Sequence, residues 1–151
     1  NDTATTEIYT LSLHDALPIY MDAGELDMGH VFAFLSVEAA YSHGTEWLDQ
    51  CLAYIQGNID FVDEFLKKHA PKIKAIRPEA SYLVWLDCRE LELSQKDLNE
   101  FFVDKAHLAL NDGEMFGKEG IGFMRLNVAS PRCIIEKAMK QLADAYQLYI
   151  K

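Results

Sequence analysis

The residue with the clearest chemical content is Arg125, which stands in the middle of an otherwise apolar run, residues 120–132. Alternation along a strand would put Phe123, Arg125 and Asn127 on one face and three apolar residues on the other, which predicts that the second face is buried. A guanidinium is always charged, and its planar fork fits a carboxylate through two parallel hydrogen bonds. Because a partly buried arginine is costly without such a partner, we predict that Arg125 binds a carboxylate. The alternative is an ion pair with an acidic residue of the same chain that only adds stability.

Charge and composition argue against two classes of partner. The 151-residue chain has a formal net charge of −10, half of its residues are hydrophobic, and it contains no basic cluster. Such a surface repels the phosphates of nucleic acid, so we expect no nucleic-acid partner. No apolar run is long enough to cross a bilayer, so we expect no membrane partner either.

Metal and disulfide chemistry are not indicated. The three cysteines lie far apart and form no Cys-x-x-Cys pair, so a reducing, cytoplasmic setting is expected. The histidines outside the first 19 residues show no metal-like spacing to one another or to acids; these are His30, His43, His69 and His107. We therefore predict no metal site.

The hydrophobic pattern predicts two helices in the first part of the chain. Residues 31–43 form an apolar segment that ends at Gly44, a natural helix stop. Thr45 then caps a long helix whose apolar residues recur every three or four positions up to Leu66. Gly57 is a weak point in this helix and a candidate kink.

The second part of the chain predicts an α+β fold. Strands are predicted at residues 72–77, 81–87 and 107–110 and around Arg125, with a turn at residues 111–113. Ser94 and Asp97 begin a helix before the third strand, and Ser130 and Pro131 begin the last helix. This order predicts helices packed over a mostly antiparallel sheet.

The loop at residues 111–120 is a second place where function could reside. It contains Phe116, an aromatic residue that a polar loop does not need for solubility. The spacing of its glycines is irregular and no helix follows at once, so phosphate binding is not indicated. We interpret these glycines as a source of loop flexibility.

Several short motifs follow one another along the chain: EAAYSHGTEWL at residues 38–48, Gly57-Asn58, PEASYLVWLD at residues 78–87, ALNDG at residues 109–113 followed by Phe116-Gly117, and the Arg125 stretch. In this order and spacing they resemble the carboxyl-terminal end of fold-type-I pyridoxal-phosphate enzymes. The resemblance is to the MalY/PatB branch of cystathionine β-lyases and their aminotransferase relatives, and it spans roughly Gly24 to Lys151. It implies that the fold is the small C-terminal domain of such an enzyme, preceded by a long interdomain helix.

This resemblance implies that Arg125 anchors the α-carboxylate of an amino-acid substrate, with Tyr82, Phe116 and Asn127 as candidate residues lining the site. It also implies pyridoxal 5'-phosphate and a homodimer in the full-length parent. No lysine of this chain stands in the family's serine-rich motif that binds the cofactor covalently, a motif that lies upstream of the matched region. We therefore expect that this chain alone binds no cofactor, contains no catalytic residue and is inactive.

Three functions stay open for the intact protein. The resemblance favours a carbon-sulfur β-lyase similar to cystathionine β-lyase. An aminotransferase of class I/II needs the same arginine, so Arg125 does not choose between the two. The third is a stand-alone α+β module in which Arg125 captures a carboxylate ligand or an acidic partner.

Residues 1–19 match, codon by codon, the in-frame translation of a common short-read sequencing adapter, and we expect them to be non-native. Residues 1–19 carry three acidic residues and no Lys or Arg, so residues 20–151 have a formal net charge of −7. We expect a truncated gene, with residues 20–44 as a remnant of the large cofactor-binding domain and residues 45–151 as the long helix and the small domain.

Overall fold

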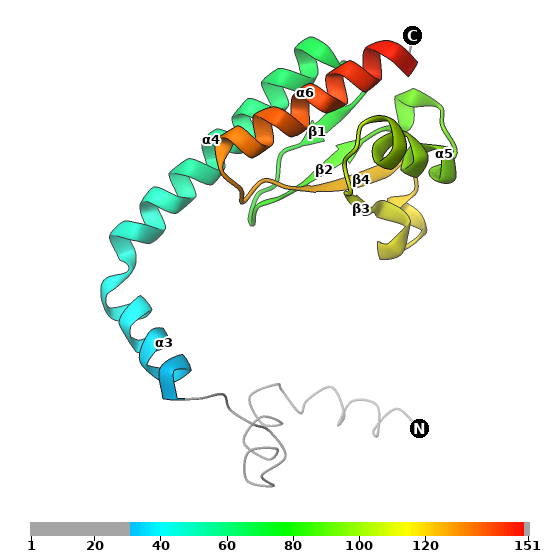
Figure 1. The fold of residues 1–151 in the computed structure, drawn as a ribbon. Helices are drawn as coiled ribbons and strands as arrows, with labels where there is room; N and C mark the ends of the chain where they lie inside the picture. The colour runs from blue at the N-terminus through cyan, green and yellow to red at the C-terminus, as the bar shows by residue number, and fades with distance from the viewer. Residues whose placement is uncertain (1–30, 150–151) are drawn as a thin grey trace, which may run out of the picture. The chain divides into compact units, whose positions relative to one another are not determined.

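The computed structural model describes residues 31–149 (Figure 1). The predicted adapter-derived segment, residues 1–19, and the first part of the predicted large-domain remnant, residues 20–30, lie outside the described residues. The described chain divides into two units, with the boundary between Trp47 and Leu48.

The first unit contains helix α3 (Val31–His43) and the start of helix α4 (Thr45–His69). As predicted, α3 ends at Gly44, whose N–H donates to the carbonyl of Ala40 at 2.8 Å. A Cβ at Gly44 would lie 2.4 Å from that carbonyl oxygen, which explains why glycine stands here. The long helix α4 continues through Gly57 without a break.

The second unit contains the rest of α4 and a four-stranded sheet in the order β1-β2-β4-β3. The strands are β1 (Lys74–Ile76), β2 (Leu83–Asp87), β3 (Asn111–Asp112) and β4 (Phe123–Asn127), and all three neighbouring pairs are antiparallel. Helix α5 (Gln95–Glu100) and a π-helical turn (Phe101–Lys105) lie between β2 and β3, and helix α6 (Arg132–Tyr149) closes the chain. The predicted α+β fold with an antiparallel sheet is therefore confirmed.

The prediction was wrong about the third strand. Residues 107–110 form no strand; instead the predicted turn residues Asn111 and Asp112 pair with Arg125 and Met124 of β4. His107 adopts a positive φ of 55° and breaks the extended path, while the N–H of Leu108 donates back to Phe102. The turn begins one residue after Asp112, where a short 3-10 helix (Gly113–Phe116) starts.

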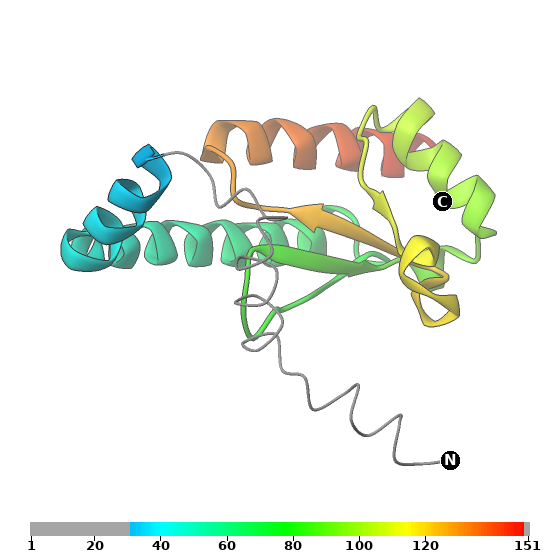
Figure 2. The same ribbon diagram turned by 90° about the horizontal axis from the view of Figure 1, so that it is seen from below.

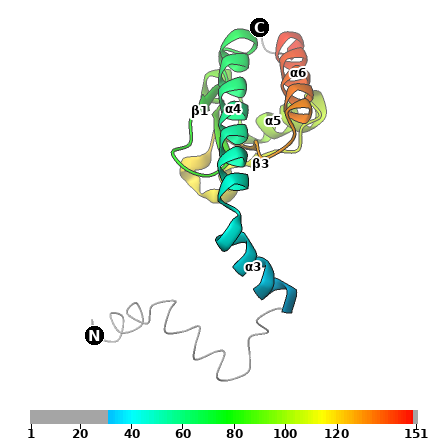
Figure 3. The same cartoon turned by 90° about the vertical axis from the view of Figure 1, so that its left-hand side faces the viewer.

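Helices α4 and α6 lie along one face of the sheet, above it in Figure 1, and Figure 3 shows the two helices side by side along their length. One apolar core joins them to the strands: Ile59, Val62 and Leu66 of α4, Val84 and Leu86 of β2, Met124 and Leu126 of β4, and Ile135, Met139 and Leu142 of α6. The other sheet face, toward the viewer's side in the view from below (Figure 2), keeps partly exposed side chains. Among the described residues, no helix is both long and apolar enough to cross a membrane.

Candidate functional site

Strand β4 presents Arg125 on the sheet face that the helices leave uncovered. Met124 and Leu126 are buried, whereas Phe123 and Arg125 are half-buried and Asn127 is exposed, which confirms the alternation expected from the sequence. Across the ladder, Arg125 pairs with Trp85 of β2 on one side and with Asn111 of β3 on the other. The arginine therefore stands between an aromatic and an amide side chain.

The guanidinium of Arg125 has partners that orient it but do not neutralise it. One terminal nitrogen, Nη2, donates to Oδ1 of Asn111 at 3.1 Å, and the guanidinium carbon lies 4.3 Å from the centroid of the Phe116 ring. The Nε atom is buried and has no hydrogen-bond partner. Among residues 31–149, no aspartate or glutamate forms an ion pair with this side chain. A local ion pair, the alternative explanation of Arg125, is not found in this part of the chain.

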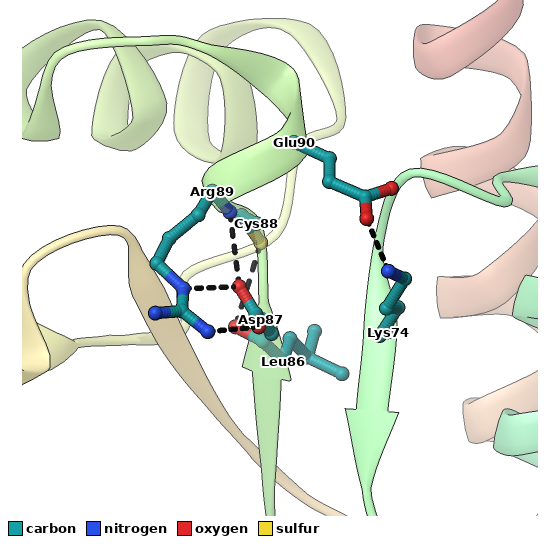
Figure 4. Close-up of polar contacts among 6 residues, drawn as sticks. All are labelled: Lys74, Leu86, Asp87, Cys88, Arg89 and Glu90. Atoms are coloured by element: carbon teal, nitrogen blue, oxygen red, sulfur yellow. Dashed lines mark hydrogen bonds and ion pairs between the residues drawn. The ribbon is translucent and has the colours of Figure 1, made fainter.

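A second arginine on the same side of the sheet shows the contrast. Arg89 also lies over an aromatic ring, with its guanidinium carbon 4.8 Å from the Phe123 centroid. However, it donates from Nε and Nη2 to the two carboxylate oxygens of Asp87 at 2.9 and 2.7 Å, and its backbone N–H also reaches Asp87 (Figure 4). The hydrogen bonds from Arg89 lower the pKa of Asp87, and Asp87 raises the pKa of Arg89. Nearby, Lys74 pairs with Glu90 (Figure 4).

The ring that covers Arg125 is held by a compact loop. Phe116 ends the first of two 3-10 helices, Gly113–Phe116 and Lys118–Gly120, and packs edge-on against Trp85 with 5.4 Å between centroids. A Cβ at Gly113 would lie 2.2 Å from the carbonyl oxygen of Gly120, and one at Gly120 would lie 2.0 Å from that of Gly113. At these two positions glycine permits close backbone contact, a role that the interpretation of the glycines as a source of loop flexibility did not include.

Asp112 fixes this loop to the rest of the second unit. Its carboxylate accepts hydrogen bonds from the side chains of Gln95 and Asn99 and from the backbone N–H of Glu114. The Oε1 atom of Gln95 accepts a further bond from the N–H of Gly122 at 2.7 Å. The carboxylate of Asp112 thus joins α5, the loop and the start of β4.

The other end of β4 is fixed by a buried amide. Asn58 of α4 is fully buried, and its Nδ2 donates to the carbonyls of Val128 and Ser130, both at 2.9 Å. Its Oδ1 accepts from Nε of Arg132 at 2.7 Å, and the backbone N–H of Arg132 donates to the hydroxyl of Tyr54. We call this set of contacts the Asn58 clamp. It ties α4 to the segment that leaves β4.

The three lining residues suggested by the resemblance have different positions. Phe116 contacts Arg125 directly, as described above. Asn127 shares the Arg125 face, but its Oδ1 accepts from the N–H of Ala129 at 2.9 Å. Tyr82, 43% exposed, precedes β2 and its carbonyl accepts from the N–H of Val128. No interaction joins Tyr82 or Asn127 to Arg125 among the described residues.

Sequence reasoning missed the residues that hold the site together. Trp85, Asn111 and Asp112 were assigned only to a strand and a turn, although the first two flank Arg125. Asn58 was seen as half of a weak Gly-Asn pair, not as a clamp. A polar residue on the apolar side of a helix, as Asn58 is, signals a buried hydrogen-bond network and could have identified the clamp.

Other reactive groups do not form a site in residues 31–149. No group of three or more His, Cys, Asp or Glu side chains lies together in a way that could hold a metal ion. Burial raises the pKa of the Cys88 thiol, which therefore stays protonated and is a poor nucleophile.

A cavity of about 240 Å³ opens beside the arginine. Its walls are Ile76, Trp85, Phe116, Glu119, Gly120 and Phe123. Trp85 and Phe116 also border Arg125, so the cavity and the guanidinium are neighbours.

No family model matches this chain. Cystathionine β-lyase PatB of Bacillus subtilis is 36% identical over 116 residues, which are 77% of this chain and 30% of PatB. The structure of cystalysin from Treponema denticola, which contains a pyridoxal 5'-phosphate cofactor, has a TM-score of 0.79 and 33% identity over 84% of this chain and 32% of its own. A pyridoxal-phosphate-bound C-S lyase from Staphylococcus hominis has a TM-score of 0.77 and 25% identity over 91% of this chain and 37% of its own.

This chain thus spans about a third of the length of its relatives. The similarity in sequence and the similarity in fold lead to the same group of proteins. The chain belongs to the MalY/PatB family of fold-type-I pyridoxal-phosphate enzymes, and it corresponds to their C-terminal part.

Proposed function

We propose that this chain is the C-terminal part of a carbon-sulfur β-lyase and that Arg125 binds the α-carboxylate of its amino-acid substrate. The observation that carries the proposal is the incomplete pairing of Arg125. Its guanidinium is held by Asn111 and Phe116, its Nε is buried without a partner, and no acidic residue in the described chain neutralises it. A substrate carboxylate that binds the terminal nitrogens of the guanidinium would supply the missing charge.

The cavity beside Arg125 does not fit pyridoxal phosphate on its own. The cavity beside Arg125 is lined by apolar side chains, one carboxylate and one glycine, and by no lysine. An acidic side chain at its rim would repel a phosphate rather than bind it. We therefore propose that the remainder of the parent protein holds the cofactor, whose chemistry, when bound, is to stabilise negative charge on the substrate's α-carbon.

The role of this chain is then to bind and orient. A carboxylate on Arg125 fixes one end of the substrate, and Phe116 and Asn111 limit the rotation of the guanidinium. Such positioning lowers the entropic part of the activation free energy of the parent's reaction, although no residue of this chain takes part in bond making or breaking. The overall reaction of the parent would consume one water and release a thiol, pyruvate and ammonia from a thioether amino acid.

The test uses the full-length protein expressed from the uninterrupted gene. Thiol and pyruvate release from cystathionine and from S-alkyl cysteines is measured with and without added cofactor. Thiol and pyruvate in equal amounts support the lyase, whereas transfer of the amino group to a keto acid without thiol release would identify an aminotransferase. Neither reaction, with an intact cofactor-binding lysine upstream, would reject both enzymes and leave the carboxylate-binding module.

Arg125 is tested by substitution against a matched control. Arg125→Lys keeps the charge but loses the fork, and we expect kcat/KM to fall about 100-fold, because two charge-assisted hydrogen bonds are each worth about 1.5 kcal/mol or more. Arg89→Lys changes the same residue type on the same sheet face, but Arg89 is already paired with Asp87. We expect this control to stay within about threefold of the unsubstituted protein. Equal losses in both variants would contradict the role of Arg125.

The 151-residue chain by itself is proposed to bind no cofactor and to have no lyase activity. Incubation with pyridoxal phosphate should give only the spectrum of the free cofactor. A new visible band that disappears when one lysine is substituted would overturn this part of the proposal.

A further inference from the structure

Across the β3–β4 ladder, Arg125 faces a neutral residue. Asn111 of β3 stands directly opposite Arg125 of β4, and its Oδ1 accepts from Nη2 of the guanidinium at 3.1 Å. Directly opposed residues on antiparallel strands have Cβ atoms about 4.5–5.5 Å apart, so the register itself brings the two side chains together. A carboxamide oxygen accepts a hydrogen bond without carrying a charge. Asn111 therefore holds the guanidinium and leaves its charge unneutralised.

The next residue of β3 shows where the acidic side chain of this strand is used. Successive side chains of a strand point to opposite faces, and Asn111 is exposed whereas Asp112 is half-buried. The carboxylate of Asp112 accepts from the side chains of Gln95 and Asn99 and from a backbone N–H of the following loop. It forms no ion pair with Arg125. The one negative charge of β3 is thus bound to α5 and to the loop.

The ring contact of the guanidinium is neutral as well. The guanidinium carbon of Arg125 lies 4.3 Å from the centroid of the Phe116 ring. A long arginine side chain loses rotamer freedom when a ligand binds it, and a side chain that is ordered beforehand loses less. An amide and a ring therefore order this guanidinium in advance, while the charge that attracts a carboxylate is preserved.

We propose that Asn111 is a positioning residue for Arg125 and that its lack of charge keeps the guanidinium available to the α-carboxylate of the ligand. This inference rests on the proposed function, since it takes Arg125 as the carboxylate anchor. An aspartate of nearly the same shape at position 111 would hold the guanidinium equally well but would neutralise its charge. A leucine of similar size would leave the charge but would not hold the guanidinium.

The experiment compares two ligands that differ only in a carboxylate, on the full-length protein. L-Norvaline has the carboxylate, n-butylamine lacks it, and neither contains a carbon-sulfur bond that could be cleaved. Calorimetry gives a dissociation constant for each, and their ratio measures what the carboxylate contributes to binding. A residue that acts through Arg125 changes this ratio, whereas a residue that only supports the fold changes both constants together.

We expect Asn111→Asp to weaken norvaline binding about tenfold and Asn111→Leu to weaken it about fivefold. Butylamine binding should stay within about twofold in both variants. Gln147→Glu is the matched control for the charge change, because Gln147 is exposed on α6 and the same conversion of an amide to an acid occurs far along the chain from β3. The control should leave both constants within about twofold.

Stability gives a second signature. An aspartate opposite an arginine forms a favourable cross-strand pair, so Asn111→Asp should leave the urea midpoint of the 151-residue chain unchanged or raise it while carboxylate binding falls. Function and stability would then change in opposite directions. A lowered midpoint together with equal losses for both ligands would make Asn111 a purely structural residue and overturn the inference.

The outcomes separate this inference from the proposed function. Thiol and pyruvate release by the unsubstituted protein tests the lyase, whatever the ligand ratio. An active protein whose ratio is unchanged in Asn111→Asp overturns the role of Asn111 and leaves the lyase. An inactive protein whose ratio falls in Asn111→Asp rejects the lyase and supports Asn111. An unsubstituted protein that binds the two ligands equally, or binds neither, overturns the inference together with the carboxylate anchor.

Discussion

Two arginines on one sheet face, Arg89 and Arg125, differ in whether the chain supplies their counter-ion. Arg89 has a carboxylate two residues away and a complete fork, so its charge contributes to local structure. Arg125 has an amide and a ring but no acid within the described residues. The charge of Arg125 is therefore not matched by an acid within the described residues, and this difference from Arg89 is visible only in three dimensions.

The Asp87 pair leads to a prediction about acid stability. The pKa of Asp87 is lowered from its ordinary value of 3.8, so its contribution to the free energy of unfolding is present above about pH 4 and is lost as the pH falls through the lowered pKa. Asp87→Asn should therefore lower stability at pH 6 by about 1 kcal/mol or less, because the pair is partly exposed. Urea unfolding at pH 6 and at pH 2.5 measures this, and the difference between the two proteins should shrink at the lower pH. A difference independent of pH would contradict an ionic role for Asp87.

At the scale of elements, the loop before β4 is held by close backbone contacts and by the hydrogen bonds of Asp112. Its two 3-10 helices return the backbone so closely that Gly113 and Gly120 touch, and Asp112 joins the loop to α5. Phe116 is carried on this support above Arg125. The position of the ring therefore depends on backbone contacts far from the ring itself.

Gly120→Ala should displace this support. A methyl group 2.0 Å from the carbonyl oxygen of Gly113 forces the backbone apart, and we expect a loss of about 2 kcal/mol or more in the free energy of unfolding. Trp85 fluorescence should change as well, because Phe116 packs against its ring. Gly57→Ala serves as the control: its Cβ would meet only Nη2 of Arg132, at 3.3 Å, and helix propensity favours the change by up to about 1 kcal/mol. If Gly120→Ala were as stable as the control, the loop would be looser than described.

The elements that could be predicted from the sequence are those with strong local signals. The alternation around Arg125, the glycine stop of α3 and the Ser94 cap, whose Oγ accepts from the N–H of Asp97, were all found. The strand at Asn111 and Asp112 was not, because its pairing with β4 and its side-chain bonds override the turn preference of these residues. The carboxylate role of Arg125 itself stays a prediction.

At the scale of the whole molecule, the two units differ in how well their apolar side chains are buried. The second unit has an apolar core, whereas the first unit has none among the described residues. The first unit leaves large hydrophobic side chains of α3 exposed, among them Phe34, Leu35, Val37 and Tyr41, which is 88% exposed. The matched region is about a third of the length of the relatives, and the rest of the parent protein and a second subunit are the proposed cover for such surface. The homodimer of the parent remains a proposal of this kind.

We expect the isolated 151-residue chain to self-associate, because contiguous exposed apolar surface promotes aggregation. Sedimentation at increasing protein concentration measures this. A variant with Phe34→Gln, Val37→Gln and Tyr41→Gln should associate less, while the thermal transition of the second unit should stay within a few degrees of the original. A monodisperse monomer at all concentrations, without the substitutions, would contradict the expectation.

The Asn58 clamp offers a spectroscopic reporter of the strand that carries Arg125. Both hydrogens of one carboxamide are donated to carbonyls directly after β4, in a fully buried position. Such a group exchanges its hydrogens slowly with solvent, and its two proton resonances should remain distinct and protected long after surface amides have exchanged. Val128 directly follows the strand that carries Arg125. Loss of that protection on heating or on ligand binding would therefore report that the end of this strand has loosened, without any label on Arg125 itself.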